Sequence, residues 1–242
     1  MRSRKAFSSA CGALVIYILL AGCSRAPETA QQEHEPGPSA AAEHPAQAAP
    51  DPRPVIVAFG DSLTAGQGLD PELSYPAVLE RELAAKGHSY RVINAGVSGD
   101  TTGGGLARVD AVLALQPRIV ILELGANDGL RGLPVETTRA NLEQIIVALR
   151  RGGAKVVLAG MTLPPNYGPD YIHSFERVFV DLASKYGLPH IPFLLADVAT
   201  RRDRMQGDGL HPNAAGQRVV AANVMRVLEP LLRENGVADG RR

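Results

Sequence analysis

The chain has 242 residues, of which 45% are hydrophobic, and its formal net charge at neutral pH is zero. This composition suffices for one sizeable hydrophobic core, and the lack of a basic excess argues against a nucleic-acid partner. The two cysteines, Cys11 and Cys23, both precede the part of the chain that we expect to fold, so that part holds no disulfide.

The first 22 residues predict a lipoprotein signal peptide. A basic start at residues 2–5 precedes an apolar segment at 10–22, which is too short to span a bilayer. The segment ends in Leu-Ala-Gly-Cys at residues 20–23, which resembles the lipobox of bacterial lipoproteins. The resemblance implies cleavage before Cys23 and lipidation of this cysteine. The alternative is an ordinary signal peptide that leaves Cys23 unmodified.

Residues 24–53 contain no Val, Ile, Leu, Met or aromatic residue. Such a segment cannot bury enough apolar surface to offset the entropy lost on ordering. We therefore expect residues 23–53 to form a lipidated cysteine and a disordered tether, which holds the domain on the order of 30 Å from its anchor. Ser24 stands where an aspartate commonly signals retention in the inner membrane. We expect an exported lipoprotein on the periplasmic face of the outer membrane.

Strand and helix patterns alternate over residues 54–235, which we interpret as one domain followed by a flexible tail at 236–242. Apolar runs that predict strands lie at residues 55–59, 92–95, 119–124, 156–159 and 191–194. Apolar residues at helical spacing lie between and after them, at 75–83 behind the N-cap candidate Ser74, and at 142–149, 172–182 and 220–231. This alternation predicts an α/β fold with a parallel sheet.

Ser62 lies in the sequence Gly-Asp-Ser-Leu at residues 60–63, directly after the first predicted strand. Ligands of open α/β sheets bind at the carboxyl ends of the strands, where this hydroxyl would lie. Serine needs a neighbouring base to become a nucleophile. Of the six histidines, only His211 combines a loop at this edge with a nearby carboxylate, Asp208, which could orient its imidazole.

An oxyanion site requires hydrogen-bond donors that converge on one point. The candidates are the backbone N–H groups of Ser62 and Gly99 and the side-chain amide of Asn127. Each of the latter two residues, considered alone, also fits a simple turn. Asp61 and Asp128 adjoin these candidates, and we interpret both as turn-stabilising residues.

These blocks, in this order, resemble those of the GDSL or SGNH hydrolase superfamily: Gly-Asp-Ser-Leu, a glycine block, Gly-x-Asn-Asp and Asp-x-x-His-Pro. The resemblance implies a three-layer, flavodoxin-like fold with a five-stranded parallel sheet of order 2-1-3-4-5. It also implies that Ser62 is the nucleophile, His211 the base and Asp208 its orienting acid. Ser62, Gly99 and Asn127 would then form the oxyanion hole.

Residues 97–102, 123–132 and 163–168 are similar to the multifunctional bacterial acyl-CoA thioesterase, arylesterase and lysophospholipase branch. The resemblance implies an enzyme that hydrolyses esters and thioesters, with no metal and no cofactor. The sequence has no sign of its oligomeric state. Glycine- and proline-rich loops at 129–134 and 161–171 would shape an acyl groove.

Other classes fit less well. An α/β-hydrolase would have Gly-x-Ser-x-Gly, but the serine motif at residues 60–64 lacks the last glycine. A dinucleotide-binding fold would have Gly-x-Gly-x-x-Gly, but residues 103–108 lack the last glycine. No His and carboxylate residues cluster at metal-ligand spacing. The alternatives that stay open are a carbohydrate O-acetylesterase of the cell envelope and a non-catalytic lipoprotein that binds a ligand.

Overall fold

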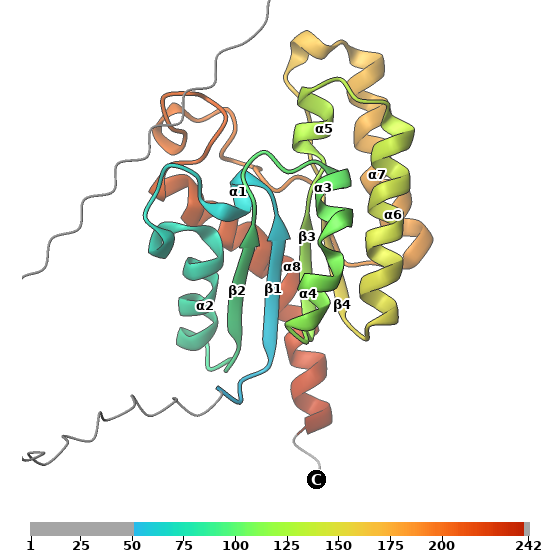
Figure 1. Ribbon diagram of the computed structural model, residues 1–242. Coiled ribbons are helices and arrows are strands. Elements are labelled where there is room, and N and C mark those ends of the chain that lie inside the picture. The colour runs from blue at the N-terminus through green and yellow to red at the C-terminus, as the bar shows by residue number, and fades with distance from the viewer. Residues whose placement is uncertain (1–50, 240–242) are drawn as a thin grey trace, which may run out of the picture. The chain divides into compact units, whose positions relative to one another are not determined.

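The computed structural model describes residues 51–239 (Figure 1). The predicted signal peptide, Cys23 and most of the predicted tether lie outside the described residues. At the start of the described part, Arg53 donates hydrogen bonds to Glu80 Oε1 and to Tyr90 O, which fasten the chain before the first strand. Within residues 51–239, no helix is both long and apolar enough to cross a membrane.

Five parallel strands form one sheet in the order β2-β1-β3-β4-β5, as predicted. The strands are β1 (Val55–Gly60), β2 (Arg91–Gly96), β3 (Ile119–Glu123), β4 (Lys155–Ala159) and β5 (His190–Ile191). Strands β1 and β3 lie in the middle and are buried almost throughout, which explains their continuous apolar sequences. Strand β2 is an edge strand and stays partly exposed.

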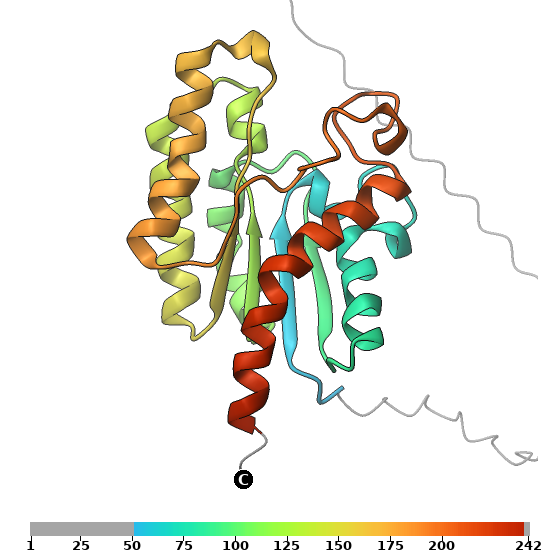
Figure 2. The same cartoon turned by 180° about the vertical axis from the view of Figure 1, so that it is seen from behind.

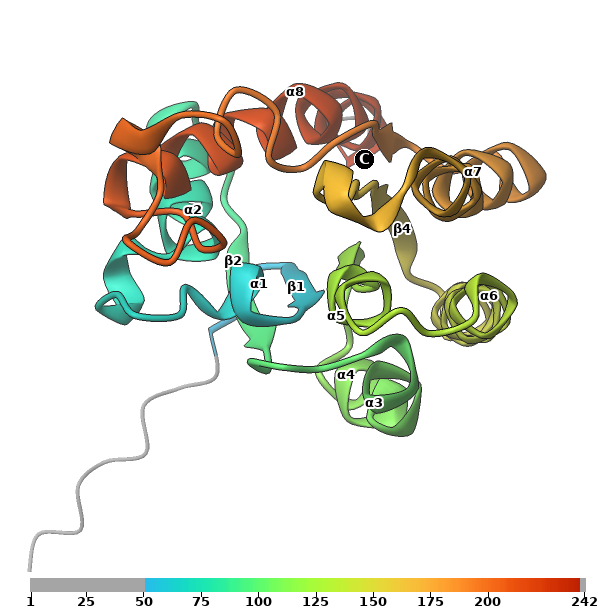
Figure 3. The same ribbon diagram turned by 90° about the horizontal axis from the view of Figure 1, so that it is seen from above.

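Helices cover both faces of the sheet, which gives the predicted three layers. They are α1 (Ser62–Ala65), α2 (Tyr75–Ala85), α3 (Thr102–Ala107), α4 (Val109–Ala114), α5 (Ala126–Leu130), α6 (Val135–Arg151), α7 (Pro169–Tyr186) and α8 (Ala214–Asp239). Helices α2 and α8 lie on one face, whereas α3, α4 and α6 lie on the other with α7 beside α6 (Figures 1 and 3). Figure 2, which views the molecule from the opposite side, shows α8 lying diagonally across this face of the sheet.

Helix α6 shows how sequence spacing produces the core. Its Leu142, Ile145, Ile146 and Leu149 follow the i, i+3, i+4, i+7 pattern and are completely buried. Burying each side chain stabilises the fold by about 1.5–3 kcal/mol. Polar residues occupy the opposite side of this helix, so one face packs on the sheet and the other meets solvent.

The fifth strand is shorter than the predicted segment 191–194, which is a correction to the sequence analysis. Strand β5 ends after Ile191, whose carbonyl accepts from the Gly160 N–H at 2.7 Å, because the regular alternation of ladder donors, which would use Phe193 next, breaks off there. The chain then turns, and the Leu194 N–H donates to Gly160 O at 3.0 Å. Leu194 nevertheless stays buried, which accounts for the apolar run.

Three further details differ from the predictions. Helices α3 and α4 were not expected: three consecutive glycines at 103–105 conceal the helical pattern of α3, and α4 is only six residues long. Ser74 occupies the N-cap of α2, but its hydroxyl donates to Pro71 O instead of accepting from the helix. Helix α8 continues to Asp239, four residues past the domain boundary predicted at 235. The helix continues although Pro230 lies inside it and has no backbone N–H for a helical hydrogen bond.

Candidate active site

Ser62 begins the short helix α1, directly beyond the carboxyl end of β1 (Figure 1). The turn into this helix is fixed by Asp61, whose Oδ1 accepts a hydrogen bond from the Leu63 N–H at 3.0 Å. Ser62 is 8% exposed. Its hydroxyl is therefore held on a rigid turn at the sheet edge, as the sequence predicted.

His211 and Asp208 complete a continuous line of hydrogen bonds from Ser62. The Nε2 atom of His211 lies 2.9 Å from Ser62 Oγ, and its Nδ1 lies 2.6 Å from Asp208 Oδ2. The carboxylate can only accept, so Nδ1 carries the proton and Nε2 is free to accept the serine proton. Residues 149 positions apart thus meet in one site.

The loop that presents His211 is itself tied down. Asp208 Oδ1 accepts from the backbone N–H groups of Leu210 and His211, at 2.9 and 3.0 Å. The Gln206 N–H donates to His211 O at 2.7 Å, which closes the loop. The hydrogen bonds from His211 and the loop amides lower the pKa of Asp208 to about 2. Asp208 therefore stays ionised at every pH at which the protein would work.

Asn127 lies in α5, beyond the carboxyl end of β3, and borders the same cavity as Ser62. Its Nδ2 donates to Asp61 Oδ2 at 3.1 Å and to Asp100 O at 2.9 Å. Both amide hydrogens are thus occupied in this structure. Donation to an oxyanion requires the bond to Asp61 to be exchanged or shared, which the sequence did not reveal.

Gly99 lies in the loop after β2 and adopts a φ of 82°, which favours glycine. Its carbonyl oxygen accepts from Arg131 Nη2 at 2.8 Å, a contact that fastens this loop to the end of α5. Gly99 is at the predicted sheet edge but is not among the residues that border the cavity. Its role as an oxyanion donor stays a prediction.

A cavity of about 460 Å³ opens beside Ser62, within the range of small-molecule sites. We call it the site cavity. Its lining is mostly apolar and comprises Asp61, Ser62, Leu63, Ala126, Asn127, Leu130, Met161, Thr162, Leu163, Pro164, Pro165, Phe193, Leu195, Ala199, Thr200, Met205, Gly209, Leu210 and His211. The two predicted groove loops contribute to this wall. The contribution from 193–205 was not predicted, because residues 193–194 were interpreted as the end of a strand and residues 195–205 have no motif or periodic pattern.

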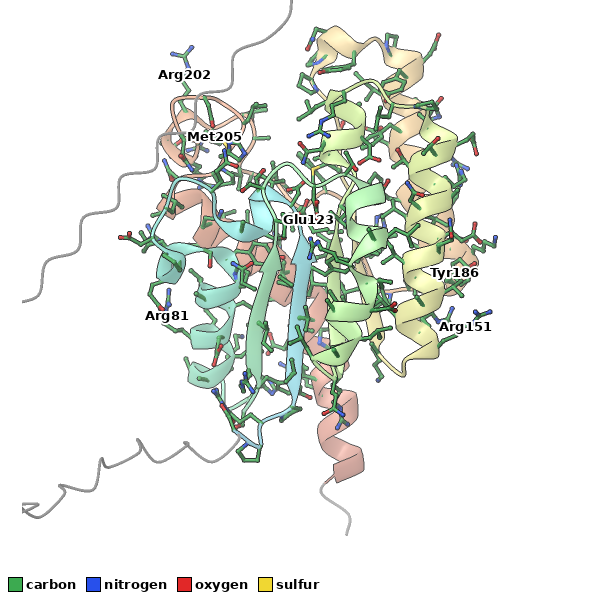
Figure 4. The ribbon with its side chains drawn as sticks, in the orientation of Figure 1. Arg81, Glu123, Arg151, Tyr186, Arg202 and Met205 are labelled. Carbon is green, nitrogen blue, oxygen red and sulfur yellow. The ribbon has the colours of Figure 1, made fainter. Side chains whose placement is uncertain are left out.

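Three buried acids surround the site. Asp128 accepts from the N–H and the hydroxyl of Thr102, at 2.8 and 2.5 Å, and so fixes the start of α3. Asp61 has its two bonds to Leu63 and Asn127. Glu123, which the sequence analysis did not single out, lies at the end of β3 near α1 (Figure 4). Figure 4 also labels Met205, which belongs to the loop before α8 and lines the site cavity. The sequence signal that could have identified Glu123 is its position as the only acid of β3, at the end of an otherwise apolar strand.

A family model described as the GDSL-like lipase/acylhydrolase family matches residues 58–219, which is more than half of the chain. The chain belongs to this family. The match includes Ser62, Gly99, Asn127, Asp208 and His211, the five residues predicted to do the chemistry. It is an ester-hydrolysing enzyme family, as the sequence analysis expected.

Known relatives place the hydrolase in the predicted branch. It is 45% identical to esterase TesA of Pseudomonas aeruginosa, over 73% of this chain and 89% of that protein. It is 38% identical to thioesterase 1/protease 1/lysophospholipase L1 of Escherichia coli, over 73% of this chain and 84% of the relative. An arylesterase of Vibrio mimicus is 40% identical over 72% and 87% of the two chains.

Solved structures agree. A crystal structure of TesA covers 73% of this chain and 99% of its own, with a TM-score of 0.71 and 44% identity. The psychrotrophic esterase EstA from Pseudoalteromonas, in a structure inhibited by monoethylphosphonate, covers 74% and 98% with a TM-score of 0.69 and 35% identity. The parallel α/β fold and its family are therefore confirmed.

Among residues 51–239, no three His, Cys, Asp or Glu side chains are grouped so that they could hold a metal ion. The polar groups at the site are instead a hydroxyl, an imidazole, a carboxylate and amide donors. This donor set suits proton transfer and oxyanion binding. That the reaction needs no metal or cofactor stays a prediction.

Proposed function

We propose that this hydrolase is a serine esterase that cleaves carboxylic esters and thioesters through an acyl-enzyme on Ser62. The observation that carries the proposal is the hydrogen-bonded line from Ser62 through His211 to Asp208, at the wall of the site cavity. Nucleophile, base and orienting acid stand within hydrogen-bond reach of each other, which is the geometry of nucleophilic acyl transfer.

In the first half-reaction, Ser62 Oγ bonds to the substrate carbonyl carbon while its proton passes to His211 Nε2. The tetrahedral intermediate then collapses, and the bond from carbon to the leaving oxygen or sulfur breaks. His211 returns its proton to the leaving group. Asp208 stays ionised and stabilises the imidazolium that forms in between.

In the second half-reaction, water attacks the acyl-enzyme while His211 takes one of its protons. The acid product leaves, and the proton returns to Ser62 Oγ. The N–H groups of Ser62 and Gly99 and the amide of Asn127 would hold the oxyanion in both steps. Each such donor stabilises the transition state by about 3–4 kcal/mol.

The site cavity supports an acyl group longer than acetyl. Side chains such as Leu163, Phe193 and Leu195 offer an apolar wall, which an acetyl group alone would not cover. The predicted alternative, a carbohydrate O-acetylesterase, would instead lose activity once the acyl group exceeds a few carbons. A series of p-nitrophenyl esters of increasing chain length separates the two functions.

The mechanism is tested with the chain from residue 24 onward, with p-nitrophenyl esters and an acyl thioester as substrates. We expect turnover by the wild type and a loss of about 10³-fold or more in Ser62→Ala and His211→Ala. Ser184→Ala and His173→Ala remove the same groups from exposed positions of α7 and serve as matched controls. Full activity in Ser62→Ala would overturn the proposal. Failure of the wild type on every ester and thioester would favour the non-catalytic alternative.

We also propose that the hydrolase is lipid-anchored through Cys23 on the periplasmic face of the outer membrane. The proposal is supported by the lipobox at residues 20–23 and by Ser24 after the cysteine. Metabolic labelling with palmitate should mark the full chain and not Cys23→Ser. An unlabelled, processed chain that leaves Cys23 a free thiol would overturn it, and separation of the two membranes tests the location.

A further inference from the structure

Glu123 binds both ends of the turn that carries the proposed nucleophile. It stands opposite Gly60 in the parallel register of β1 and β3 and is completely buried. Its Oε2 accepts from the Asp61 N–H at 3.2 Å and from Thr64 Oγ1 at 2.7 Å. These donors precede and follow Ser62, so a single carboxyl oxygen sets the position of the turn between them.

The backbone opposite Glu123 is shaped to admit this carboxyl group. A Cβ atom at Gly60 would lie 2.4 Å from Glu123 Oε2 and 2.1 Å from Thr64 Oγ1. No side chain fits at such distances. The glycine of the Gly-Asp-Ser-Leu motif therefore makes room for an acid that comes from another strand.

Hydrogen bonds extend from Glu123 to the proposed oxyanion site. Glu123 receives the backbone N–H of Asp61, and the Asp61 carboxylate receives the Asn127 amide at 3.1 Å. Asp61 therefore helps to hold Asn127, which Asp100 O also holds at 2.9 Å, and Glu123 helps to hold Asp61. The nucleophile and one oxyanion donor share a single buried support.

The surroundings of Glu123 favour its neutral form. Glu123 Oε1 is buried and has no hydrogen-bond partner among the described residues. Burial, and then the nearby charge of Asp61, raise the pKa of Glu123 well above its ordinary value. An unpaired buried charge costs far more than an unpaired neutral group.

The other titratable and charged groups that face this cluster do not neutralise a Glu123 carboxylate. Tyr75, from α2, lies 3.2 Å from Thr64 Oγ1, and burial raises its pKa, so it stays a neutral hydroxyl. Burial raises the pKa of Asp61 to about 6, and a positive charge on His211 opposes this rise. The His211 ring is itself bonded to Ser62 and Asp208. Arg108 donates to Gly60 O at 2.8 Å, but its ion pair is with Asp100.

We infer that Glu123 is a positioning residue that acts as a neutral carboxylic acid, holding the Ser62 turn directly and the Asn127 amide through Asp61. This inference rests on the proposed esterase function. Ionisation of Glu123 would place a second negative charge beside Asp61, whose carboxylate is bonded to the proposed oxyanion donor Asn127. The charge would oppose the transition state, so the neutral form is the active one.

The test compares Glu123→Gln with Glu123→Ala in the chain from residue 24 onward. Glutamine keeps an acceptor oxygen for Asp61 and Thr64 and cannot ionise. We expect Glu123→Gln to keep kcat within about threefold of the wild type, and Glu123→Ala to lose about tenfold or more with little change in KM. Glu143→Gln is the matched control, since Glu143 is a partly buried acid of α6 that accepts from the Tyr186 hydroxyl and has no contact with the Ser62 turn.

The pH profile distinguishes positioning by a neutral acid from a purely structural role. The wild type should lose kcat at alkaline pH as Glu123 ionises, and Glu123→Gln should lack this fall. A loss of about 100-fold in well-folded Glu123→Gln would show that the charge is required and would overturn the inference. So would an unchanged alkaline fall in Glu123→Gln, or full activity in Glu123→Ala.

Thermal unfolding gives a readout that does not depend on activity. An acid whose pKa is raised in the folded state contributes stability below its unfolded pKa, and this contribution is lost as the pH rises through its folded pKa. The Tm of the wild type should therefore fall relative to that of Glu123→Gln as the pH rises above the ordinary pKa of a glutamate. Parallel Tm curves would overturn the neutral form even if no ester substrate were found, and if Glu123→Ala fails to fold, the Glu123→Gln results decide.

Discussion

Replacing Asn127 by alanine removes one proposed oxyanion donor and tests the account of this site in detail. In the free enzyme the amide is bonded to Asp61 Oδ2 and Asp100 O, at 3.1 and 2.9 Å. It therefore contributes to catalysis only once an oxyanion competes for it. Loss of one such donor costs about 3–4 kcal/mol of transition-state stabilisation, which corresponds to a fall in kcat of about 10²–10³-fold.

The same substitution has a separate effect on stability. It leaves the buried Asp61 carboxylate with one hydrogen bond fewer, which destabilises the fold by about 1–3 kcal/mol. For a domain of this size, the Tm should fall by about 2–10 °C. KM should change little, because the amide is expected to bind the transition state rather than the substrate.

The assay is steady-state hydrolysis of a p-nitrophenyl ester, at a temperature well below the Tm of every variant. Asn141→Ala is the matched control, since Asn141 is also partly buried but donates to Thr102 Oγ1, at 3.1 Å. It should lose stability and keep kcat. A folded Asn127→Ala with kcat within about threefold of the wild type would refute the oxyanion role of this amide.

Three further variants test neighbouring parts of the account. Asp208→Asn presents an amide to His211 Nδ1, favours the wrong tautomer and should lower kcat by about 10³–10⁴-fold. Because the pKa of Asp208 is lowered to about 2 in the fold, its contribution to stability is present above its ordinary pKa and is lost as the pH falls through 2. Acid unfolding of Asp208→Asn should thus be less steep below pH 4, and an unchanged curve would contradict the lowered pKa. Gly60→Ala places a Cβ 2.1 Å from Thr64 Oγ1, so its Tm should drop by about 5–10 °C; a wild-type Tm would show that the carboxyl cluster is loosely packed. Ala199→Trp fills the site cavity from an exposed position and should lower kcat/KM for long acyl esters about tenfold more than for acetyl esters. An equal loss across the chain-length series would place the acyl group elsewhere.

The sheet could be predicted from the sequence because the buried strands consist of apolar residues, which form recognisable runs. Strands β1 and β3 consist almost wholly of apolar residues, since neither face of a central parallel strand meets solvent. The end of β5 was harder to place, because Leu194 is buried in a turn and reads like a strand residue. Helix α3 was missed for the opposite reason, as its glycines have low helix propensity and tertiary contacts override it.

In the site, too, residues in short local motifs could be predicted, whereas contacts between distant segments could not. Ser62, Asp208 and His211 could be predicted because short motifs place them at the edge where parallel strands end. Glu123 escaped prediction, because its importance lies in a fully buried contact with a turn 62 residues away. The bond between Asn127 and Asp61 also joins separate motifs, and neither motif alone implies it.

Acylation of Ser62 during turnover is tested directly by the mass of the trapped intermediate. The chain from residue 24 onward is mixed with a long-chain p-nitrophenyl ester, quenched in acid within milliseconds and digested for peptide mass spectrometry. We expect the peptide containing Ser62 to gain the mass of the acyl group, and we expect no adduct in Ser62→Ala. An acyl adduct on another residue, or full turnover with no adduct on Ser62, would contradict this expectation.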